Sequence, residues 1–205
     1  MDKTSKFNHI LSKYLPEEFV SYVADLILQS NVKFKIVAPR RSKLGDFKAS
    51  IKNTNKSQIT INGDLNPYAF LITTLHELAH LYTYNSYKHR VSPHGKEWKK
   101  EFSNLLEPVH SDKALPKDLK IALSKSINNL KASSCSDIHL SRALKKFDTQ
   151  KKTVTLEELE ENTYFIINKK TYSKGKLRRT RYLCKEISSG KTYLIHALAE
   201  VNRSA

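Results

Sequence analysis

The spacing of apolar residues predicts that the first part of the chain is helical and then changes to strands. Residues 5–29 carry apolar side chains at helical spacing. Over residues 33–62 the period shortens, because charged and apolar positions alternate in 33–37 and again in 57–62, as they do in half-buried strands. A further short run, Phe47–Ile51, is a third candidate strand. We therefore expect a small antiparallel sheet of three strands in this region.

Helical spacing returns after the strands. A helix is predicted over residues 66–87, because Pro67 stands at a favourable first position and apolar residues recur with the helical period. A second helix is predicted over residues 94–107, where a proline follows. Two weaker, lysine-rich helical patterns cover residues 117–130 and 137–147. These two are interpreted as outer helices or as part of a linker.

In the last quarter of the chain, apolar and polar residues alternate again. Strands are predicted at 164–167, 181–184 and 192–195, with the polar separators Lys169-Lys170, Lys174-Gly175-Lys176 and Ser188-Ser189-Gly190. The fold class is therefore α+β, with helices and a small antiparallel sheet followed by a small C-terminal β module. The predicted boundaries are 1–110 for the main domain, 111–150 for a helical linker and 151–205 for the β module.

The composition indicates which partners and which cellular compartment to expect for the chain. Its 205 residues have a formal net charge of +16, and an excess of this size favours polyanionic partners, nucleic acid before an anionic membrane surface. No apolar run reaches the 18 residues of a membrane-spanning helix, and no apolar signal core follows the first residues. We therefore expect a cytoplasmic protein, with association to the nucleoid allowed. The two cysteines, Cys135 and Cys184, are expected to be reduced thiols.

The motif with the most chemical content is His76-Glu77-Leu78-Ala79-His80, within the predicted 66–87 helix. His76 and His80 are one helical turn apart, so both imidazoles face the same way. Glu77 lies beside the first histidine, where its carboxylate can reach a metal-bound water. Two helical histidines with a glutamate base form the zincin pattern. It predicts one catalytic zinc ion with three protein ligands and an open position for water.

Three histidines compete for the third ligand position. His94 is preferred, because it opens the next predicted helix and Trp98 one turn later would fix it by packing between helices. His89 lies in a stretch with lysine and arginine, where a solvated surface histidine is the simpler interpretation, and His110 is the other competitor. A chance occurrence of the motif and a purely structural zinc site are the alternatives to a catalytic centre. A structural site usually carries cysteines and would leave Glu77 without a role.

The motif residues define a mechanism of peptide hydrolysis. Glu77 would accept the proton of the zinc-bound water as that water attacks a peptide carbonyl, and would then deliver it to the leaving nitrogen. In zinc peptidases a strand near the metal often pairs with the extended substrate backbone. The predicted 57–62 strand is the candidate for this role, although a purely structural sheet explains it equally well.

The motif and the segment after it resemble the SprT-like metallopeptidase family, which includes the protease Spartan. The resemblance rests on the His76–His80 motif and on Pro93-His94-Gly95-Lys96-Glu97-Trp98, and it covers roughly residues 15–107. It implies that His76, His80 and His94 hold the zinc ion and that Glu77 is the catalytic base. Many members end in a zinc ribbon with two cysteine pairs. The C-terminal module here has only Cys184, so a second zinc ion is not expected.

The C-terminal module is rich in cations. Five of them crowd one hairpin-like stretch with interleaved aromatic residues: Lys174, Lys176, Arg178, Arg179 and Arg181. Cations that neutralise phosphates, beside rings that stack on bases, suit single-stranded or distorted DNA. A solvated basic face over an aromatic core explains the same pattern equally well.

Taken together, the residues and the resemblance predict a zinc-dependent endopeptidase that hydrolyses peptide bonds in proteins associated with nucleic acid. Two other functions stay open. One is a nucleic-acid-binding adaptor with a zinc site and little or no proteolytic activity. The other is a zinc hydrolase that acts on amides other than peptides.

Overall fold

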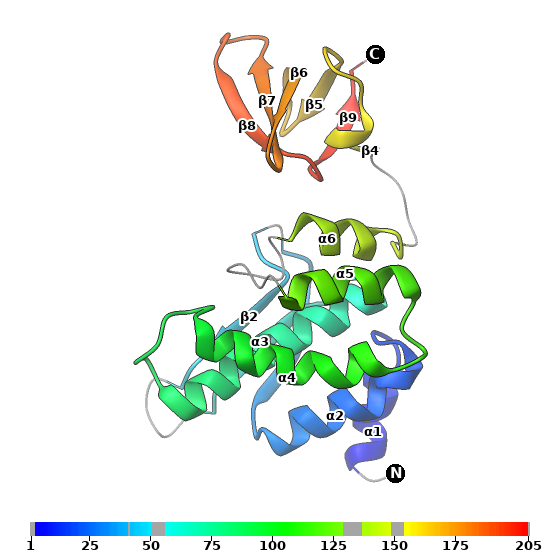
Figure 1. Ribbon diagram of the computed structural model, residues 1–205, viewed down its shortest axis with the longest axis vertical. Helices are drawn as coiled ribbons and strands as arrows, with labels where there is room; N and C mark the ends of the chain where they lie inside the picture. The colour runs from blue at the N-terminus through cyan, green and yellow to red at the C-terminus, as the bar shows by residue number, and fades with distance from the viewer. Residues whose placement is uncertain (1–2, 41, 51–55, 129–136, 149–153, 205) are drawn as a thin grey trace. The chain divides into compact units, whose positions relative to one another are not determined.

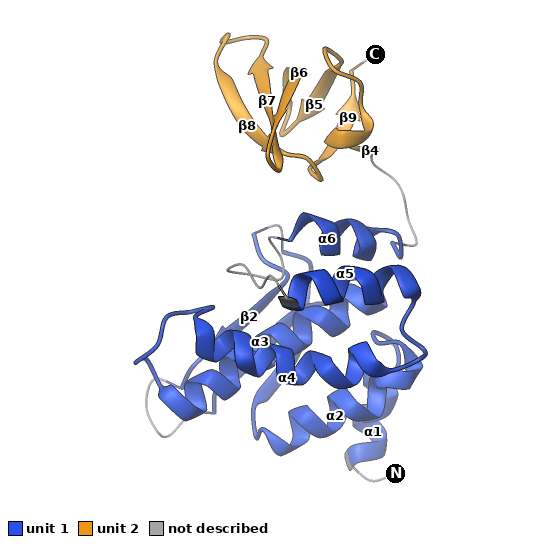
Figure 2. Cartoon of the chain, viewed as in Figure 1, with its two compact units in different colours: residues 1–148 blue, residues 149–205 orange. Residues whose placement is uncertain are grey.

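The computed structural model describes residues 3–40, 42–50, 56–128, 137–148 and 154–204 (Figure 1). The chain divides into two compact units, Met1–Asp148 and Thr149–Ala205 (Figure 2). Within the described residues, no helix is long and apolar enough to cross a membrane. The predictions for Ile51 and Cys135 lie outside the described residues.

The first unit begins with two helices, which lie in the segment predicted to be helical. Helix α1 spans Lys3–Leu11, a short 3-10 turn covers Glu17–Phe19, and α2 spans Val20–Gln29. Pro16 lies between α1 and the 3-10 turn with ψ 138°, outside the helical region. Proline also disfavours helical backbone at the residue before it, so α1 cannot continue through this position. The buried side chains of α2 follow the predicted apolar stripe.

Three strands follow: β1 (Lys33–Val37), β2 (Gly45–Lys48) and β3 (Gln58–Asn62). Their order is β1-β3-β2, with β1 parallel to β3 and β2 antiparallel to β3. The prediction of an antiparallel sheet was therefore wrong, since the sheet is mixed. Alternation of apolar residues reports which face of a strand is buried, but it carries no information on strand direction.

The position of β3 also corrects the predicted substrate strand. β3 is the middle strand, hydrogen-bonded on one side to β1 and on the other to β2. Its backbone therefore cannot pair with an additional chain. Burial agrees, because Ile59 and Ile61 are fully buried. Within the described residues, β2 is the outer strand on the other side of β3 from β1.

The motif helix and the helix after it form the centre of the unit. Helix α3 spans Pro67–Tyr87, and the side chain of Asn66 caps it by accepting from the backbone N–H of Ala69 at 2.9 Å. Helix α4 spans Lys96–Ser111, so it continues through Pro108 instead of ending before it. α3 contacts the sheet through β2 and β3 and contacts α4 with another side (Figure 1). It is accordingly buried on most sides, as its sequence predicted.

Two further helices join the same core. Helix α5 spans Lys117–Asn128 and α6 spans Ile138–Lys145. Their buried leucines belong to the apolar cluster that contains α3 and α4: Leu119, Leu123 and Leu140. The structure thus places both helices of the predicted linker segment within the first unit.

The second unit is a six-stranded antiparallel sheet with a core of its own. Its elements are β4 (Val154–Thr155), a 3-10 turn (Leu156–Glu158), β5 (Tyr164–Ile167), β6 (Lys170–Arg178), β7 (Arg181–Glu186), β8 (Thr192–His196) and β9 (Glu200–Arg203). The strand order is β4-β9-β5-β6-β7-β8. Phe165, Tyr172 and Cys184 are among the buried residues of this core. The cysteine is therefore a buried apolar residue, as expected.

Strand β6 was missed from the sequence. The segment Lys174-Gly175-Lys176 resembles a polar separator, yet it lies inside this strand. The register against β7 shifts between Lys174 and Leu177, so the alternation that would identify a strand is broken there. Gly175 permits the irregularity, because a Cβ atom at this position would lie 2.2 Å from the carbonyl oxygen of Leu183.

Candidate metal centre

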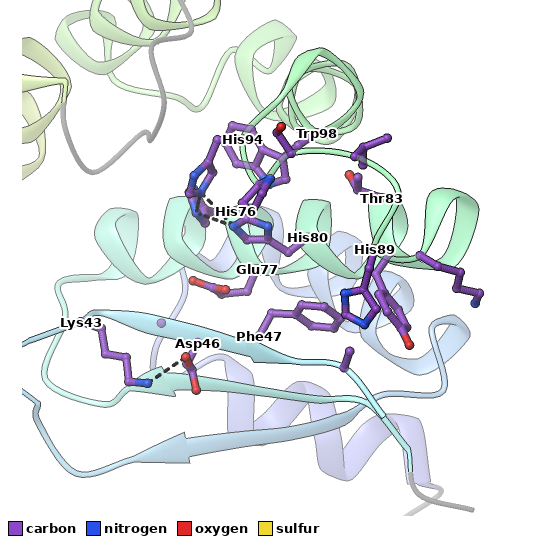
Figure 3. Close-up of a pocket in the computed structure, with 17 residues that line it drawn as sticks. Lys43, Asp46, Phe47, His76, Glu77, His80, Thr83, His89, His94 and Trp98 are labelled. Carbon is purple, nitrogen blue, oxygen red and sulfur yellow. Dashed lines mark hydrogen bonds and ion pairs between the residues drawn. The ribbon is translucent and has the colours of Figure 1, made fainter. Parts of the chain in front are cut away.

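Two consecutive helices and the loop between them bring three histidines together (Figure 3). Helix α3 carries His76 and His80 one turn apart, on the side that packs against α4. His94 comes from the loop and adopts a left-handed backbone with φ 59°. Gly95 is the N-cap of α4, so His94 precedes this helix rather than opening it. The structure thus places His94, the preferred third histidine, beside His76 and His80.

The three Nε2 atoms form a nearly equilateral triangle. They lie 3.1 Å apart for His76 and His80, 3.0 Å for His80 and His94, and 3.2 Å for His76 and His94. Each imidazole nitrogen offers either one N–H or one lone pair, so three mutual contacts cannot all be hydrogen bonds. Two nitrogens bound to a tetrahedral zinc ion at about 2.0–2.1 Å are about 3.3 Å apart. The three histidines therefore fit one metal ion.

Burial keeps the three imidazoles in the neutral form that binds metals. It lowers the pKa of His76 to about 3 and the pKa of His80 to about 4, and the neighbouring imidazoles add to both shifts. Burial also lowers the pKa of His94. At neutral pH the three rings are consequently uncharged, and a metal ion does not have to displace a proton from a charged ring.

Trp98 holds the three imidazoles in place. This side chain of α4 is fully buried. Its ring centroid lies 4.7 Å from that of His76, 5.4 Å from that of His80 and 4.7 Å from that of His94. Phe102 stacks on Trp98 at a centroid distance of 4.9 Å and also contacts the ring of His76. Packing from one aromatic residue therefore fixes all three rings, as the sequence argument expected for His94.

Glu77 is buried beside the triad, with only 7% of its surface exposed. Burial and, to a smaller extent, the nearby carboxylate of Asp46 raise the pKa of this carboxyl group to about 7. The backbone N–H of Phe47 and the cations Arg40 and Lys43 act in the opposite direction. A pKa near neutral pH suits a group that must accept a proton in one step and donate it in the next.

The outer strand β2 supplies the wall against which Glu77 rests. A Cβ atom at Gly45 would lie 2.6 Å from Oε1 of Glu77, 2.8 Å from its Cγ and 2.8 Å from the side chain of Thr73. The next residue, Asp46, forms an ion pair with Lys43 at 2.8 Å. Glycine is therefore required at position 45 so that the carboxyl group can lie between α3 and β2.

Replacing Gly45 by Ala is expected to push the carboxyl group of Glu77 away from its present position. A displacement of about 1 Å at a reacting group lowers catalysis by about a hundredfold. We expect a loss of this size in kcat/KM for peptide hydrolysis, with unchanged metal content. The control is Gly63→Ala, where the added Cβ atom would meet Ile36 at 3.0 Å instead of the site. Full activity in Gly45→Ala would contradict the positioning role.

The triad and Glu77 open into a cavity of about 630 Å³. Its other lining residues come from the segment around β2, from the end of α3, from the loop before α4 and from α4 itself: Lys43, Gly45, Asp46, Phe47, Ala49, Thr83, Tyr84, Lys88, His89, Val91, Ser92, Pro93 and Trp98. A volume of this size accommodates several residues of an extended peptide.

The two competing histidines lie outside the triad. His89 lines the cavity, but its ring packs against Tyr84 at a centroid distance of 5.2 Å. His110 is near the end of α4, where its Nε2 contacts the hydroxyl group of Ser124 at 2.6 Å. Neither residue belongs to the group whose ligand atoms converge.

The basic hairpin of the second unit is only partly as predicted. Lys176, Arg178, Arg179 and Arg181 are exposed around the turn between β6 and β7. Lys174 differs, because only 3% of its surface is exposed and its ammonium group donates to the carbonyl oxygens of Glu157 and Leu159. Lys174 is therefore unavailable to a phosphate, and it is not part of the exposed cationic surface that was predicted to bind nucleic acid.

Sequence reasoning missed the contribution of β2 to the site. Gly45 and Asp46 lie outside the strands predicted from the sequence, and Phe47 was predicted only as the start of a strand. The contacts of these residues with Glu77 join positions about thirty residues apart, so no local pattern reports them. The nearest signal was Gly45 itself, because a glycine in a strand often marks a close approach of another group.

Comparison with known proteins agrees with this geometry. A model of the family described as "SprT-like family" matches residues 16–119. Protein SprT of Pseudomonas fluorescens (strain SBW25) is 34% identical over 91 residues, which are 41% of this chain and 56% of that protein. The chain thus spans little more than half the length of this relative. No solved structure gives a significant match.

Proposed function

The chain belongs to the SprT-like family, and we propose that it is a zinc-dependent endopeptidase. The observation that carries the proposal is the convergence of three neutral imidazoles within 3.2 Å of one another, beside a buried carboxyl group at the wall of one cavity. A metal site of purely structural purpose would not require that carboxyl group or an open cavity. Both features favour catalysis over an adaptor role.

Zinc is the metal that this donor set suits best. Three imidazoles with an open fourth position are a known arrangement of catalytic zinc. Imidazole also binds other divalent transition metals, so the availability of each metal in the cell contributes to which one occupies the site. A zinc ion held by His76, His80 and His94 would supply a Lewis acid and lower the pKa of a coordinated water to about 7.

Glu77 is proposed to carry the proton during hydrolysis. Its carboxylate accepts a proton from the attacking water and passes it to the nitrogen of the departing peptide. A pKa of about 7 supports both halves of this transfer. The backbone of β2, the outer strand along the cavity, is proposed to pair with the substrate chain in place of the predicted 57–62 strand.

Hydrolysis of an unfolded protein by wild-type protein and by Glu77→Gln, both loaded with zinc to the same content, tests the proposal. Peptide-bond cleavage is expected only with wild type. Equal cleavage by both proteins, or none by either, would refute it. A preparation that cleaved small amides but no peptide bond would instead support the non-peptide hydrolase.

We further propose that single-stranded or distorted DNA is a partner of the second unit. The support is the exposed group of four cations at the turn between β6 and β7, where Arg178 and Arg181 face each other across the hairpin. The one acidic residue of β7, Glu186, is buried and paired with Lys170 at 2.8 Å, so it does not offset these charges. Binding through phosphates alone would not depend on the nucleotide sequence of the DNA.

Reversing the charges of Arg178, Arg179 and Arg181 to Glu is expected to weaken binding of a single-stranded oligonucleotide. Each lost phosphate contact lowers the slope of log K against log salt by about 0.7, so the slope should fall by up to about 2. Fluorescence anisotropy over a salt series measures both quantities. The matched control reverses three exposed lysines of the first unit, Lys113, Lys117 and Lys125. Equal losses in both triple variants would show that net charge alone, and not this hairpin, governs binding.

A further inference from the structure

One end of the cavity carries a cation packed on aromatic rings. Phe47 of β2 packs against Tyr84 of α3 at a centroid distance of 5.8 Å, and Tyr84 packs against His89 at 5.2 Å. The ammonium group of Lys88 lies 5.0 Å from the centre of the Tyr84 ring. All four residues line the cavity. The Tyr84 hydroxyl group donates to the carbonyl oxygen of Ser50 at 3.4 Å and so ties the helix to the segment after β2.

The opposite end of the cavity is electrically balanced. Lys43 and Asp46 form an ion pair there, and Figure 3 shows them at the other end from His89, with Glu77 and Phe47 between. Among the described residues Lys88 has no carboxylate partner. Apart from the buried Glu77, Asp46 is the only acidic residue among the described residues that line the cavity. One end of the cavity therefore has an uncompensated positive charge, and the other has none.

Lys88 places a side chain at a backbone conformation that favours glycine. Lys88 ends α3 with φ 54° and ψ −131°, a region that glycine occupies far more readily than other residues. Its N–H bonds to the carbonyl oxygen of Tyr84 at 2.7 Å, and glycine would make the same bond. The helix end alone thus gives no reason for lysine at this position.

We propose that the Tyr84–Lys88–His89 end of the cavity is a specificity subsite that accepts an acidic side chain of the protein substrate. Lys88 is the specificity-determining residue, and the rings of Phe47 and Tyr84 take the aliphatic part of that side chain. The inference rests on the proposed endopeptidase function. β2 runs from Asp46 towards Phe47, so a substrate paired antiparallel to it places residues N-terminal to the cleaved bond in this subsite.

The test is the cleavage of a peptide library, prepared by digesting a soluble proteome, with zinc-loaded full-length protein. Mass spectrometry of the products gives the residues around each cut. Asp and Glu are expected to be enriched about two- to fivefold at one position N-terminal to the cut, the range for an exposed ion pair. In Lys88→Glu the preference at that position should change to Lys and Arg. Lys100→Glu alters the net charge equally from an exposed site outside the cavity and should keep the acidic preference.

A second variant distinguishes the effect of the Lys88 charge on substrate preference from an effect on folding. Lys88→Gly removes the cation and relieves the backbone, so it should unfold at a higher temperature while it loses the acidic preference. Wild-type cleavage without an acidic position, or the same acidic position in Lys88→Glu or Lys88→Gly, would overturn the subsite while leaving the endopeptidase proposal intact. Absence of cleavage by zinc-loaded wild type would overturn both.

Discussion

Replacing Glu77 by Gln is expected to lower kcat/KM for hydrolysis of an unfolded protein by about a thousandfold. A positioned acid–base group contributes about 10²–10⁴ to the rate of a reaction with proton transfer. Gln has nearly the same shape, and its amide oxygen can still accept the N–H of Phe47, but it cannot take a proton from water. The three histidines are untouched, so the zinc content should stay at one ion per chain. Initial rates of hydrolysis, measured for both proteins at equal metal loading, give the change in kcat/KM.

The stability of the Glu77→Gln variant provides the control for folding. The pKa of Glu77 is raised from 4.5 to about 7, so its ionisation opposes folding as pH rises through that interval. In metal-free protein, Gln should therefore be the more stable residue above pH 7, by up to about 3 kcal/mol, and the difference should vanish near pH 4. Thermal unfolding of both proteins with a chelator measures this. An inactive variant that is less stable at pH 8 would point to damaged packing instead of a lost base.

The group of three histidines that could hold a metal ion could be predicted from the sequence because its arrangement is almost local. His76 and His80 need only one helical turn to face the same way, and the apolar period around them gave the helix. His94 required one further step, the packing of Trp98 of the next helix, which the structure shows at 4.7 Å from the ring of His94. The ligand set thus depends on two consecutive helices and one loop.

The features that escaped prediction depend on distant pairing. The direction of β1 relative to β3 and the outer position of β2 arise from how the chain crosses the sheet, and apolar alternation is the same for either direction. Gly45 meets Glu77 only once the sheet has packed on α3. The burial of Lys174 follows from an irregularity in β6 that turns a polar segment into a strand. For Gly45 and Lys174, the local residue types gave no sign of these contacts.

Replacing His94 by Ala is expected to remove most of the metal affinity. Loss of a group that merely orients a ligand weakens metal binding by about 10–100-fold, so loss of a ligand itself should exceed about 100-fold. The two remaining imidazoles lie 3.1 Å apart on one helix, and no other histidine of the described residues lies within reach of them. Competition with a chromophoric chelator measures the affinity, and metal analysis after gel filtration measures the content.

His89→Ala is the matched control for the role of His94. Both histidines belong to the stretch between α3 and α4 and both line the cavity, but only His94 directs its Nε2 at those of His76 and His80. Added zinc should raise the unfolding temperature of wild type and of His89→Ala, because a ligand that binds only the folded state stabilises it by RT ln(1 + [L]/Kd). In His94→Ala the same zinc concentration should give little change. If His94→Ala kept a full equivalent of zinc with wild-type affinity, or if His89→Ala lost it, the metal centre would have a different third ligand and the geometry of the triad would not be that of a bound ion.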